Sequence, residues 1–470
     1  MAPIPSTPPD PSMARTPSTP PDPSPDTGEG SPSSAFTRRT ALSGAALLGL
    51  GTGLGAGLDR ALAQTPAATD LATSTSATPA SPSATTAFHG RHQGGIVTAP
   101  QGFLHFAAFD VTVADAADLQ ALLADWTSAG AALTSGRSVA SRTASAAGPS
   151  PASQPAPAPG PADPGEADGL GPAGLTLTFG LGPGLFDRAR LGLHARRPAR
   201  LTPLPPFAGD LLDPARSGGD LCVQACADDP QVAFHAVHVL ARLAEGRARL
   251  RWAQLGFRPR AAAPAQTPRN LLGFKDGTNN PHANDVAAMD RLVWVAAADG
   301  PAWMVGGSYL IVRRIQFVLS TWDAASLTEQ EQAIGRHKTS GAPLGARREL
   351  DAVDLRATDA RGNPVIPQDA HIRLADPHAN AGGAMLRRGY SFSAGTTEAA
   401  VDRGGHQMDA GLCFIAFVRD PAQFIAVQRR LATGDALNAF TLHTASAVFA
   451  CPPGARRGGV IADGLFATYP

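Results

Sequence analysis

The sequence is poor in cysteine, and its four cysteines lie outside the common functional motifs. Cys222 and Cys226 are spaced as C-x₃-C rather than C-x₂-C, and no C-x₂-C-H is present. These spacings exclude the usual zinc site, the thioredoxin-like redox pair and covalent attachment of a cofactor through cysteine. Because Cys413 and Cys451 also lie in apolar runs, we expect all four thiols to be small buried residues.

An excess of charge of one sign is also missing. Lys and Arg total 39, Asp and Glu total 39, and the formal net charge is zero. This balance argues against nucleic acid or an anionic membrane surface as a partner. Aromatic residues make up only 6% of the chain, which argues against a surface that stacks bases or sugars.

Glycine and proline are abundant, with 50 and 43 residues, but they are unevenly distributed. They crowd the N-terminal segment and residues 135–172, so the folded part is shorter than the chain. We expect four regions, with a Pro/Ala/Ser-rich insertion at 135–172 in the third: a disordered N-terminus with an export signal at 1–63, a flexible linker at 64–87, a first folded half at 88–270 and a second at 271–470.

The N-terminal region contains the parts of a twin-arginine (Tat) export signal. Residues 37–42 read TRRTAL, the next sixteen residues carry no charge, and Ala61-Leu62-Ala63 forms a small-residue cleavage site. A transmembrane helix or an uncleaved anchor is the alternative, although the core is short and rich in glycine. The signal predicts the Tat translocase as a partner and a periplasmic or extracellular location. Because Tat carries folded proteins, it also favours a cofactor protein.

The folded part alternates between strand and helix patterns in the same order twice. Strand–helix–strand followed by strand–helix predicts an α+β fold of two units with antiparallel sheets. The expected strands are 104–111, 175–182, 221–227, 249–257, 306–319 and 411–420, and the expected helices are 117–129, 228–246, 326–336 and 420–434. Ser326 with Glu329 and Asp420 are the expected N-terminal caps of the last two helices.

Two segments of the second half carry the residues of a redox site. Residues 273–281 read GFKDGTNNP and place Asp276 among turn-forming residues. Residues 369–392 read DAHIRLADPHANAGGAMLRRGYSF and supply His371 and two arginines, Arg387 and Arg388. An acid, an imidazole and a guanidinium are the parts needed to bind a haem iron and to split a peroxide. For Asp276, an ordinary turn aspartate is the alternative.

Together these segments resemble the dye-decolorizing peroxidases, in particular the secreted branch linked to bacterial iron uptake. The resemblance extends from about residue 88 to about residue 454, without the Pro-rich insertion. It implies two ferredoxin-like halves with antiparallel sheets, and a haem held between sheet and helices. With no C-x₂-C-H in the chain, the haem b is expected to be bound without a covalent bond.

The resemblance also implies roles for individual residues. His371 matches the proximal ligand of the haem iron, whose other ring nitrogen needs an acceptor. We expect Asp435 to be that acceptor, and Asp409 and Asp420 are weaker candidates. Asp276 matches the distal acid–base group, which moves a proton from the inner to the outer oxygen of peroxide.

Arg387 matches the distal arginine that stabilises developing negative charge. Arg388 is the alternative for this role, or else an exposed surface residue. Gly277, Thr278 and Asn279 are expected to line the haem edge. Phe414 or Phe417 is expected to shield the distal face, and packing in the core is the alternative for both.

One stretch departs from the family pattern. Asp376, Pro377 and His378 stand where the family usually has Asn-Pro-Arg. They are expected to contact the haem, and because the arginine that would bind a propionate is missing, we expect His378 or another base to replace it.

The resemblance implies an enzyme that reduces hydrogen peroxide and oxidises bulky organic donors, with electrons passing through surface tryptophans or tyrosines. The available candidates are Trp252, Trp294, Trp303, Trp322 and Tyr390. The alternatives are a deferrochelatase that releases iron from haem for ferrous iron uptake, and a haem-binding protein without catalysis. Further partners suggested by the family are iron-uptake permease components and a second copy of the chain.

Overall fold

The structure is a computed structural model that describes residues 84–139, 163–259, 266–380, 382–397 and 407–467. All of them belong to the unit that extends from Thr73 to Pro470. The predicted export signal, most of the linker and most of the Pro-rich insertion lie outside the described residues. Within the described residues, no helix is long and apolar enough to span a bilayer. The boundaries predicted for the four regions stay predictions.

Nine strands and nine α-helices are found in the described residues. The strands are β1 (Phe103–Val111), β2 (Thr176–Leu181), β3 (Leu221–Ala227), β4 (Ala248–Phe257), β5 (Ser308–Phe317), β6 (Leu386–Arg387), β7 (Tyr390–Thr397), β8 (Gln407–Val418) and β9 (Thr441–Cys451). The helices are α1 (Ala116–Leu133), α2 (Pro183–Phe186), α3 (Pro230–Leu243), α4 (Val286–Leu292), α5 (Leu319–Ala324), α6 (Leu327–Ile334), α7 (His371–Leu374), α8 (Pro421–Gly434) and α9 (Asp463–Phe466).

The strands form one sheet that closes on itself. Its order is β5-β9-β2-β3-β1-β4-β7-β8, and β8 pairs with β5 to complete the ring. Every pairing between these strands is antiparallel. The two seams, β2–β9 and β4–β7, each rest on a single residue pair, Leu181 with Ala450 and Phe257 with Ser391. The barrel therefore consists of two four-stranded sheets from the two halves of the chain, and the predicted α+β fold with two ferredoxin-like halves is confirmed.

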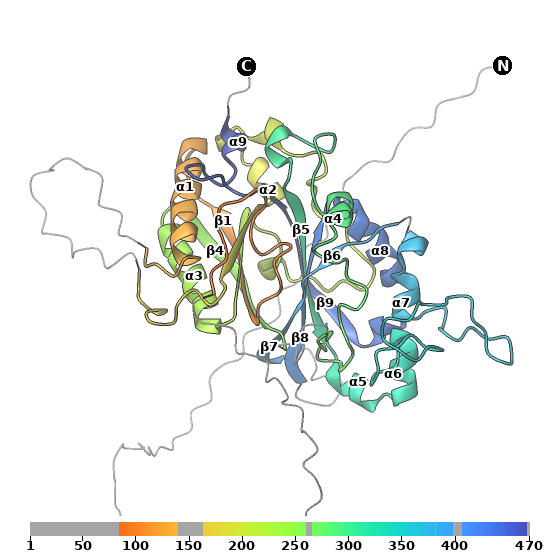
Figure 1. Ribbon diagram of the computed structural model, residues 1–470. Coiled ribbons are helices and arrows are strands. Elements are labelled where there is room, and N and C mark those ends of the chain that lie inside the picture. The colour runs from red at the N-terminus through yellow and green to blue at the C-terminus, as the bar shows by residue number, and fades with distance from the viewer. Residues whose placement is uncertain (1–83, 140–162, 260–265, 381, 398–406, 468–470) are drawn as a thin grey trace, which may run out of the picture. The chain divides into compact units, whose positions relative to one another are not determined.

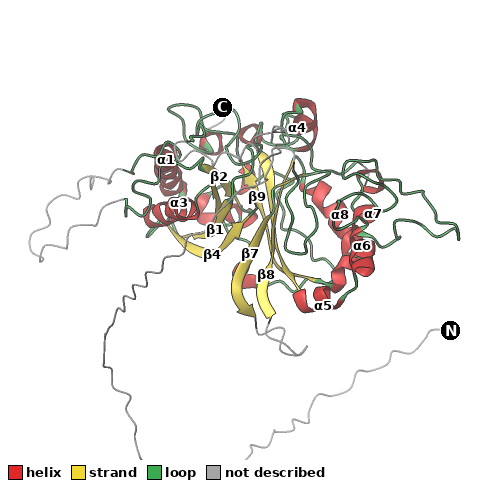
Figure 2. Ribbon diagram, turned by 60° about the horizontal axis from the view of Figure 1, so that its bottom comes forward, coloured by secondary structure: helices red, strands yellow, loops and turns green. Residues whose placement is uncertain are grey.

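Helices cover the outer faces of the two sheets on opposite sides. Figure 1 shows α1 and α3 beside β1 and β4, and α6, α7 and α8 beside the second half. Figure 2 shows the strands lying between these two groups of helices. Asp420 and Ser326 cap α8 and α6, as predicted from the sequence. The predicted capping box of Ser326 with Glu329 is present, and Asp420 forms a second one with Gln423.

The side chains of β1 show why both faces of the sheet are buried. Leu104 and Phe106 point into the barrel, and Ala107 and Phe109 belong to the core under α1 and α3. This alternation is the period of two expected for a strand. The barrel is a packed core rather than a ligand channel, so any large ligand has to bind outside it.

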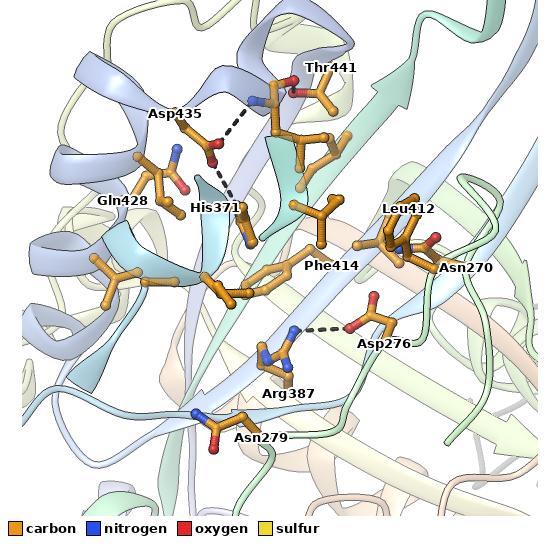
Figure 3. A pocket seen from close by; sticks show the side chains of 18 of the residues that line it. Asn270, Asp276, Asn279, His371, Arg387, Leu412, Phe414, Gln428, Asp435 and Thr441 are labelled. Atoms are coloured by element: carbon orange, nitrogen blue, oxygen red, sulfur yellow. Dashed lines mark hydrogen bonds and ion pairs between the residues drawn. The ribbon is translucent and has the colours of Figure 1, made fainter. Parts of the chain in front are cut away.

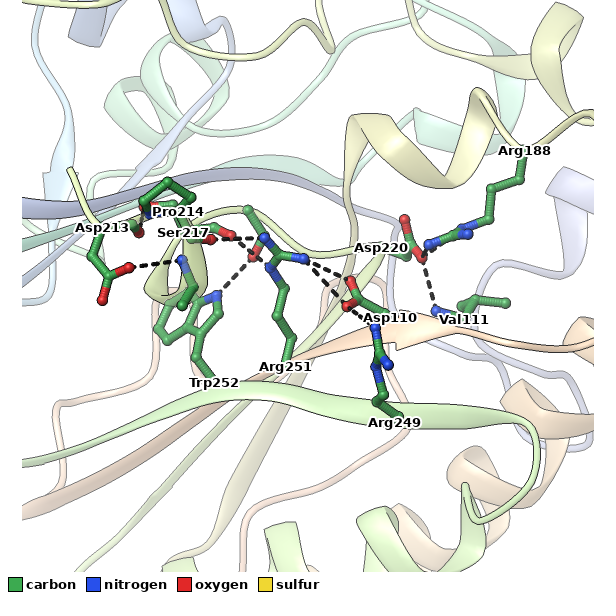
Figure 4. Close-up of polar contacts among 12 residues, drawn as sticks. Asp110, Val111, Arg188, Asp213, Pro214, Ser217, Asp220, Arg249, Arg251 and Trp252 are labelled. Atoms are coloured by element: carbon green, nitrogen blue, oxygen red, sulfur yellow. Dashed lines mark hydrogen bonds and ion pairs between the residues drawn. The ribbon is translucent and has the colours of Figure 1, made fainter. Parts of the chain in front are cut away.

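Buried carboxylates fasten the ends of the first-half strands (Figure 4). Asp220 accepts a hydrogen bond of 2.8 Å from the Val111 N–H and also pairs with Arg188. Arg251 on β4 pairs with Asp110 on β1 at 3.2 Å. These contacts join strands and loops of the first half, and none of their residues lines the cavity in the second half.

We expect Gly411→Ala to destabilise the barrel at its closing strand. Gly411 on β8 lies between Gln316 on β5 and Phe392 on β7. A Cβ at this position would lie 2.0 Å from the Ile315 carbonyl oxygen, so β5 would have to move. We expect a loss of about 1–3 kcal/mol in the free energy of unfolding, measured by chemical denaturation. Gly300→Ala is the control because its Cβ would meet open space, and equal stability of the two variants would contradict the prediction.

Candidate active site

The main cavity lies between the outer face of the second-half sheet and helices α7 and α8. Its volume is about 270 Å³. The sheet side is formed by β5, β8 and β9, and the other side by residues of α7 and α8. The large apolar side chains that line it include Leu272, Phe274, Ile315, Phe317, Ile334, Val353, Ile372, Met385, Leu412, Phe414, Phe424, Val427, Leu431 and Leu437. Such walls suit a large flat apolar ligand.

His371 is the first residue of α7, and its ring faces this cavity (Figure 3). Its Nδ1 lies 2.6 Å from Oδ2 of Asp435, whose side chain is only 4% exposed. The other oxygen of Asp435 accepts a hydrogen bond of 2.9 Å from the Leu437 N–H. Burial alone would lower the pKa of His371, but the charge and the hydrogen bond of Asp435, with the charge of Asp276, together outweigh burial, and the pKa is raised. With Nδ1 engaged, Nε2 is the nitrogen left for a ligand in the cavity.

The structure brings Asp435 rather than the two other predicted carboxylates to His371. Asp409 pairs with Arg314 through both oxygens at 2.6 Å. Asp420 caps α8 and pairs with Arg200 at 3.1 Å.

Asp276 and Arg387 lie together on the side of the cavity opposite His371 (Figure 3). Arg387 Nη1 donates to Asp276 Oδ1 over 3.0 Å. The side chain of Arg387 is 32% exposed and that of Asp276 is 27% exposed, and both line the cavity. Since Arg387 belongs to β6 and Asp276 to the turn after Phe274, segments more than 100 residues apart form this pair.

Arg388 has a different environment from Arg387. It is 2% exposed and donates to the Thr98 carbonyl oxygen and to Gln101 Oε1. The prediction of an exposed Arg388 is therefore wrong, because its side chain fastens β7 to the segment before β1. Of the two adjacent arginines, Arg387 alone lines the cavity.

The two phenylalanines predicted to shield the distal face lie on opposite faces of the sheet. Phe414 lines the cavity, whereas Phe417 is fully buried inside the barrel. Residues on β8 alternate between the two faces of the sheet, and these two differ by an odd number of positions. Phe414 is thus the one placed to contact a ligand.

Of the three residues predicted to contact the cofactor at positions 376–378, two line the cavity and one does not. Asp376 and Pro377 line the cavity, as do Gly277, Thr278 and Asn279. His378 does not: its side chain is 98% exposed, and its Nδ1 lies 3.1 Å from Asp376 Oδ1. The structure therefore gives no support to His378 as the replacement cation, since its ring points into solvent.

Arg336 is a cation at the cavity that the sequence reasoning missed. It is 8% exposed, and Nη1 donates to the carbonyl oxygens of Gly341 and Glu349 at 2.8 and 3.1 Å. Burial and the nearby Arg387 lower its pKa, against the charge of Glu349. A buried guanidinium at this place can bind a carboxylate such as a haem propionate.

Glu349 is a second missed residue, and it holds the turn that carries Asp276. It forms an ion pair with Lys275, and Thr278 Oγ1 donates to Glu349 Oε1 over 2.9 Å. Burial alone would raise the pKa of Glu349, but hydrogen bonds from Lys275, Thr267 and Thr278 hold it below its usual value. No local pattern identifies Glu349, because its partners lie about 70 positions earlier in the chain.

These residues fit a haem better than a bare metal ion. No group of three or more His, Cys, Asp or Glu side chains that could hold an ion occurs in the described part of the chain. Two histidines line the cavity, and His371 is the one whose ring is hydrogen-bonded to a buried carboxylate. The cavity also offers apolar walls and the buried guanidinium of Arg336. This is the donor set for an iron whose other four ligands come from a macrocycle.

The aromatic residues predicted for electron transfer are not at the surface. Trp252, Trp294, Trp303, Trp322 and Tyr390 are each at most 9% exposed. The prediction that they are surface residues is wrong, because each fills a core. Trp322 contacts two residues of the cavity wall: its Nε1 donates to the Leu272 carbonyl oxygen over 3.1 Å, and its ring meets Phe274 edge-on at 5.8 Å between centroids.

Two family models match the chain. They are "Dyp-type peroxidase, N-terminal" over residues 93–258 and "Dyp-type peroxidase, C-terminal" over residues 267–456. A dye-decolorizing peroxidase of Thermobifida fusca is 45% identical over 311 residues, which cover 65% of this chain and 70% of the relative. A deferrochelatase of Escherichia coli K12 is 38% identical over 377 residues, which cover 78% and 84%.

Solved structures with the same fold include a Dyp-type peroxidase of Streptomyces coelicolor. It matches with a TM-score of 0.74 and 40% identity, over 82% of this chain and 98% of that one. An oxyferrous complex of DtpA from Streptomyces lividans matches with a TM-score of 0.73 and 40% identity, over the same shares.

Proposed function

Because the chain belongs to the Dyp-type peroxidase family and is a haem-dependent peroxidase, we propose that it binds haem b without a covalent bond and uses hydrogen peroxide to oxidise bulky organic donors. The observation that carries this proposal is the placement of two pairs across one cavity. His371 with Asp435 lies on one side, and Asp276 with Arg387 lies on the other. The four cysteines are buried thiols, which supports a haem held without a thioether bond.

The residues of the cavity have different roles in peroxide reduction. Bound haem supplies a redox-active iron, so that one H₂O₂ takes two electrons and two protons to give two waters. Asp276 takes a proton from one peroxide oxygen and delivers it to the other, which leaves as water. Arg387 stabilises the negative charge that develops as the O–O bond breaks. His371 would hold the iron, and Asp435 would keep its ring in place and make it a stronger ligand.

We further propose that the protein is exported by the Tat route and acts in the periplasm or outside the cell. The support is the twin arginine, the uncharged core and the small-residue site in residues 37–63. The Tat translocase would be a partner, with permease components and a second copy of the chain as further candidates. A Lys-Lys replacement of Arg38 and Arg39 should keep the protein in the cytoplasm, as measured by cell fractionation.

The test of the activity is a rapid-mixing absorption experiment on haem-loaded protein with one equivalent of peroxide. We expect the haem spectrum to change within milliseconds and to return when a bulky phenolic or anthraquinone donor is added. A spectrum that only bleaches, without donor oxidation, would contradict the peroxidase proposal.

Iron release from haem is a second candidate, favoured by the relative that bears the name deferrochelatase. The same incubation, extracted and analysed for free protoporphyrin, distinguishes the two. Intact protoporphyrin with released ferrous iron supports iron release, and haem recovered whole after many turnovers supports the peroxidase. Haem that stays bound and unchanged in both assays would indicate a carrier.

A further inference from the structure

Asn280 lies outside the cavity but contacts the backbone of the cavity arginine. Its Nδ2 donates to the Arg387 carbonyl oxygen over 2.9 Å, and the Arg387 N–H donates to Asn280 Oδ1 over 2.8 Å. Asn280 is not among the residues that line the cavity. One amide side chain thus pairs with both backbone groups of one residue, as a neighbouring strand would.

The position of Arg387 in the sheet explains why this pairing is available. β6 has only two residues, Leu386 and Arg387, and it pairs with β8 opposite Phe417 and Ala416. The Arg388 N–H donates to the Ile415 carbonyl oxygen over 2.7 Å, so the residue after Arg387 bonds to β8. The backbone groups of Arg387 point the other way, toward the open edge of the sheet. Without Asn280 they would have no strand partner there.

The turn that holds Asn280 also holds Asp276. The Asn280 N–H donates to the Gly277 carbonyl oxygen over 2.9 Å, and Gly277 has a φ of 120°, which a residue with a side chain rarely adopts. The turn therefore fixes the spacing between the Asp276 carboxylate and the Asn280 amide. The Asp276 carboxylate accepts a hydrogen bond from the guanidinium of Arg387, and the Asn280 amide is hydrogen-bonded to the Arg387 backbone. The turn thus contacts Arg387 at both its side chain and its backbone.

We infer that Asn280 is a positioning residue for the peroxide reaction, which it serves by holding the Arg387 backbone in register with Asp276. This inference rests on the proposed peroxidase function. When Asp276 exchanges a proton with peroxide, its contact with the Arg387 guanidinium has to loosen. The paired hydrogen bonds to Asn280 keep the strand in place, so that only the guanidinium moves and charge stabilisation is preserved.

The test is a double-mutant cycle of Asn280→Ala and Arg387→Leu on the haem-loaded protein. The quantity measured is the second-order rate constant with hydrogen peroxide. We expect Asn280→Ala to lower it about 10- to 100-fold, the loss that a small misplacement of a catalytic group produces. The double variant should be no slower than Arg387→Leu alone, because Asn280 acts through the Arg387 side chain. The haem content of Asn280→Ala should match wild type, because Asn280 does not line the cavity.

Asn363→Ala is the matched control, because Asn363 holds an exposed turn through Asp359 and has no contact with the cavity. If Asn280→Ala does not fold, Asn280→Asp enters the same cycle, since its carboxylate can still accept from the Arg387 N–H. Losses that multiply in the double variant, or an Asn280→Ala rate equal to wild type, would overturn the inference. A wild-type protein that does not react with peroxide would refute the proposed function instead.

Discussion

Asp276→Asn should lower the second-order rate constant for hydrogen peroxide by about 10²- to 10⁴-fold, the usual contribution of a general acid–base group. The amide has the shape of the carboxylate, and its oxygen can still accept the hydrogen bond from Arg387 that the carboxylate accepts over 3.0 Å. The variant therefore keeps the local contacts and loses only the capacity to take and return a proton. The measurement is stopped-flow absorption at equal haem content.

Two further variants separate proton transfer from charge stabilisation. Arg387→Leu removes the guanidinium and leaves a carboxylate that can still act as a base. Its second-order rate constant for hydrogen peroxide should therefore fall less than that of Asp276→Asn. Asp276→Glu keeps the acid but displaces it by one methylene, so part of the rate should return relative to Asp276→Asn. A peroxide rate in Asp276→Asn that equals wild type would remove Asp276 from the mechanism and return it to the role of a turn residue.

The parts of the site that could be predicted from sequence are those carried by one short segment each. Asp276, His371 and Arg387 lie in motifs whose residue types match the chemistry, and all three line the cavity. The caps at Ser326 and Asp420 were predictable for the same reason, because a capping box spans only four residues.

The parts that could not be predicted depend on contacts between distant segments. Arg388 is buried by hydrogen bonds to Thr98, 290 positions earlier, and no local pattern distinguishes it from Arg387. The Glu349 contacts with Lys275 and Thr278 and the Asn280 contacts with Arg387 are of the same kind.

Three strands were also missed, β6, β7 and β9. β6 is too short for any period to appear. β7 follows an arginine pair and ends beside residues 398–406, outside the described part of the chain. β9 lies between β5 and β2, and both of its faces are covered at its C-terminal end. That end is therefore largely apolar and lacks the alternation of a half-exposed strand.

His371→Ala should remove the iron ligand and reduce peroxidase activity to the background of free haem. The cavity would keep its apolar walls, so weak haem binding should persist, with faster loss of haem to a scavenger protein. Asp435→Asn should have an intermediate effect of about 10- to 100-fold on activity, since it removes the carboxylate 2.6 Å from Nδ1 but leaves the imidazole. The measurements are haem content, the rate of haem transfer and the peroxide rate on the same preparations.

His378→Ala is the informative control, because the two histidines lie only seven positions apart and the family pattern assigns a cofactor contact near each. The His378 side chain is 98% exposed and lines no part of the cavity, so its removal should leave haem content and activity unchanged. Added imidazole should restore part of the activity of His371→Ala, because the ring fits the space that the side chain vacates and Asp435 is still there to orient it. A His371→Ala protein that reacts with peroxide as wild type does would mean that another residue binds the iron. Haem loss in His378→Ala would instead show that the loop after α7 folds inward when haem is bound, and that Arg336 is not the main cation for its carboxylates.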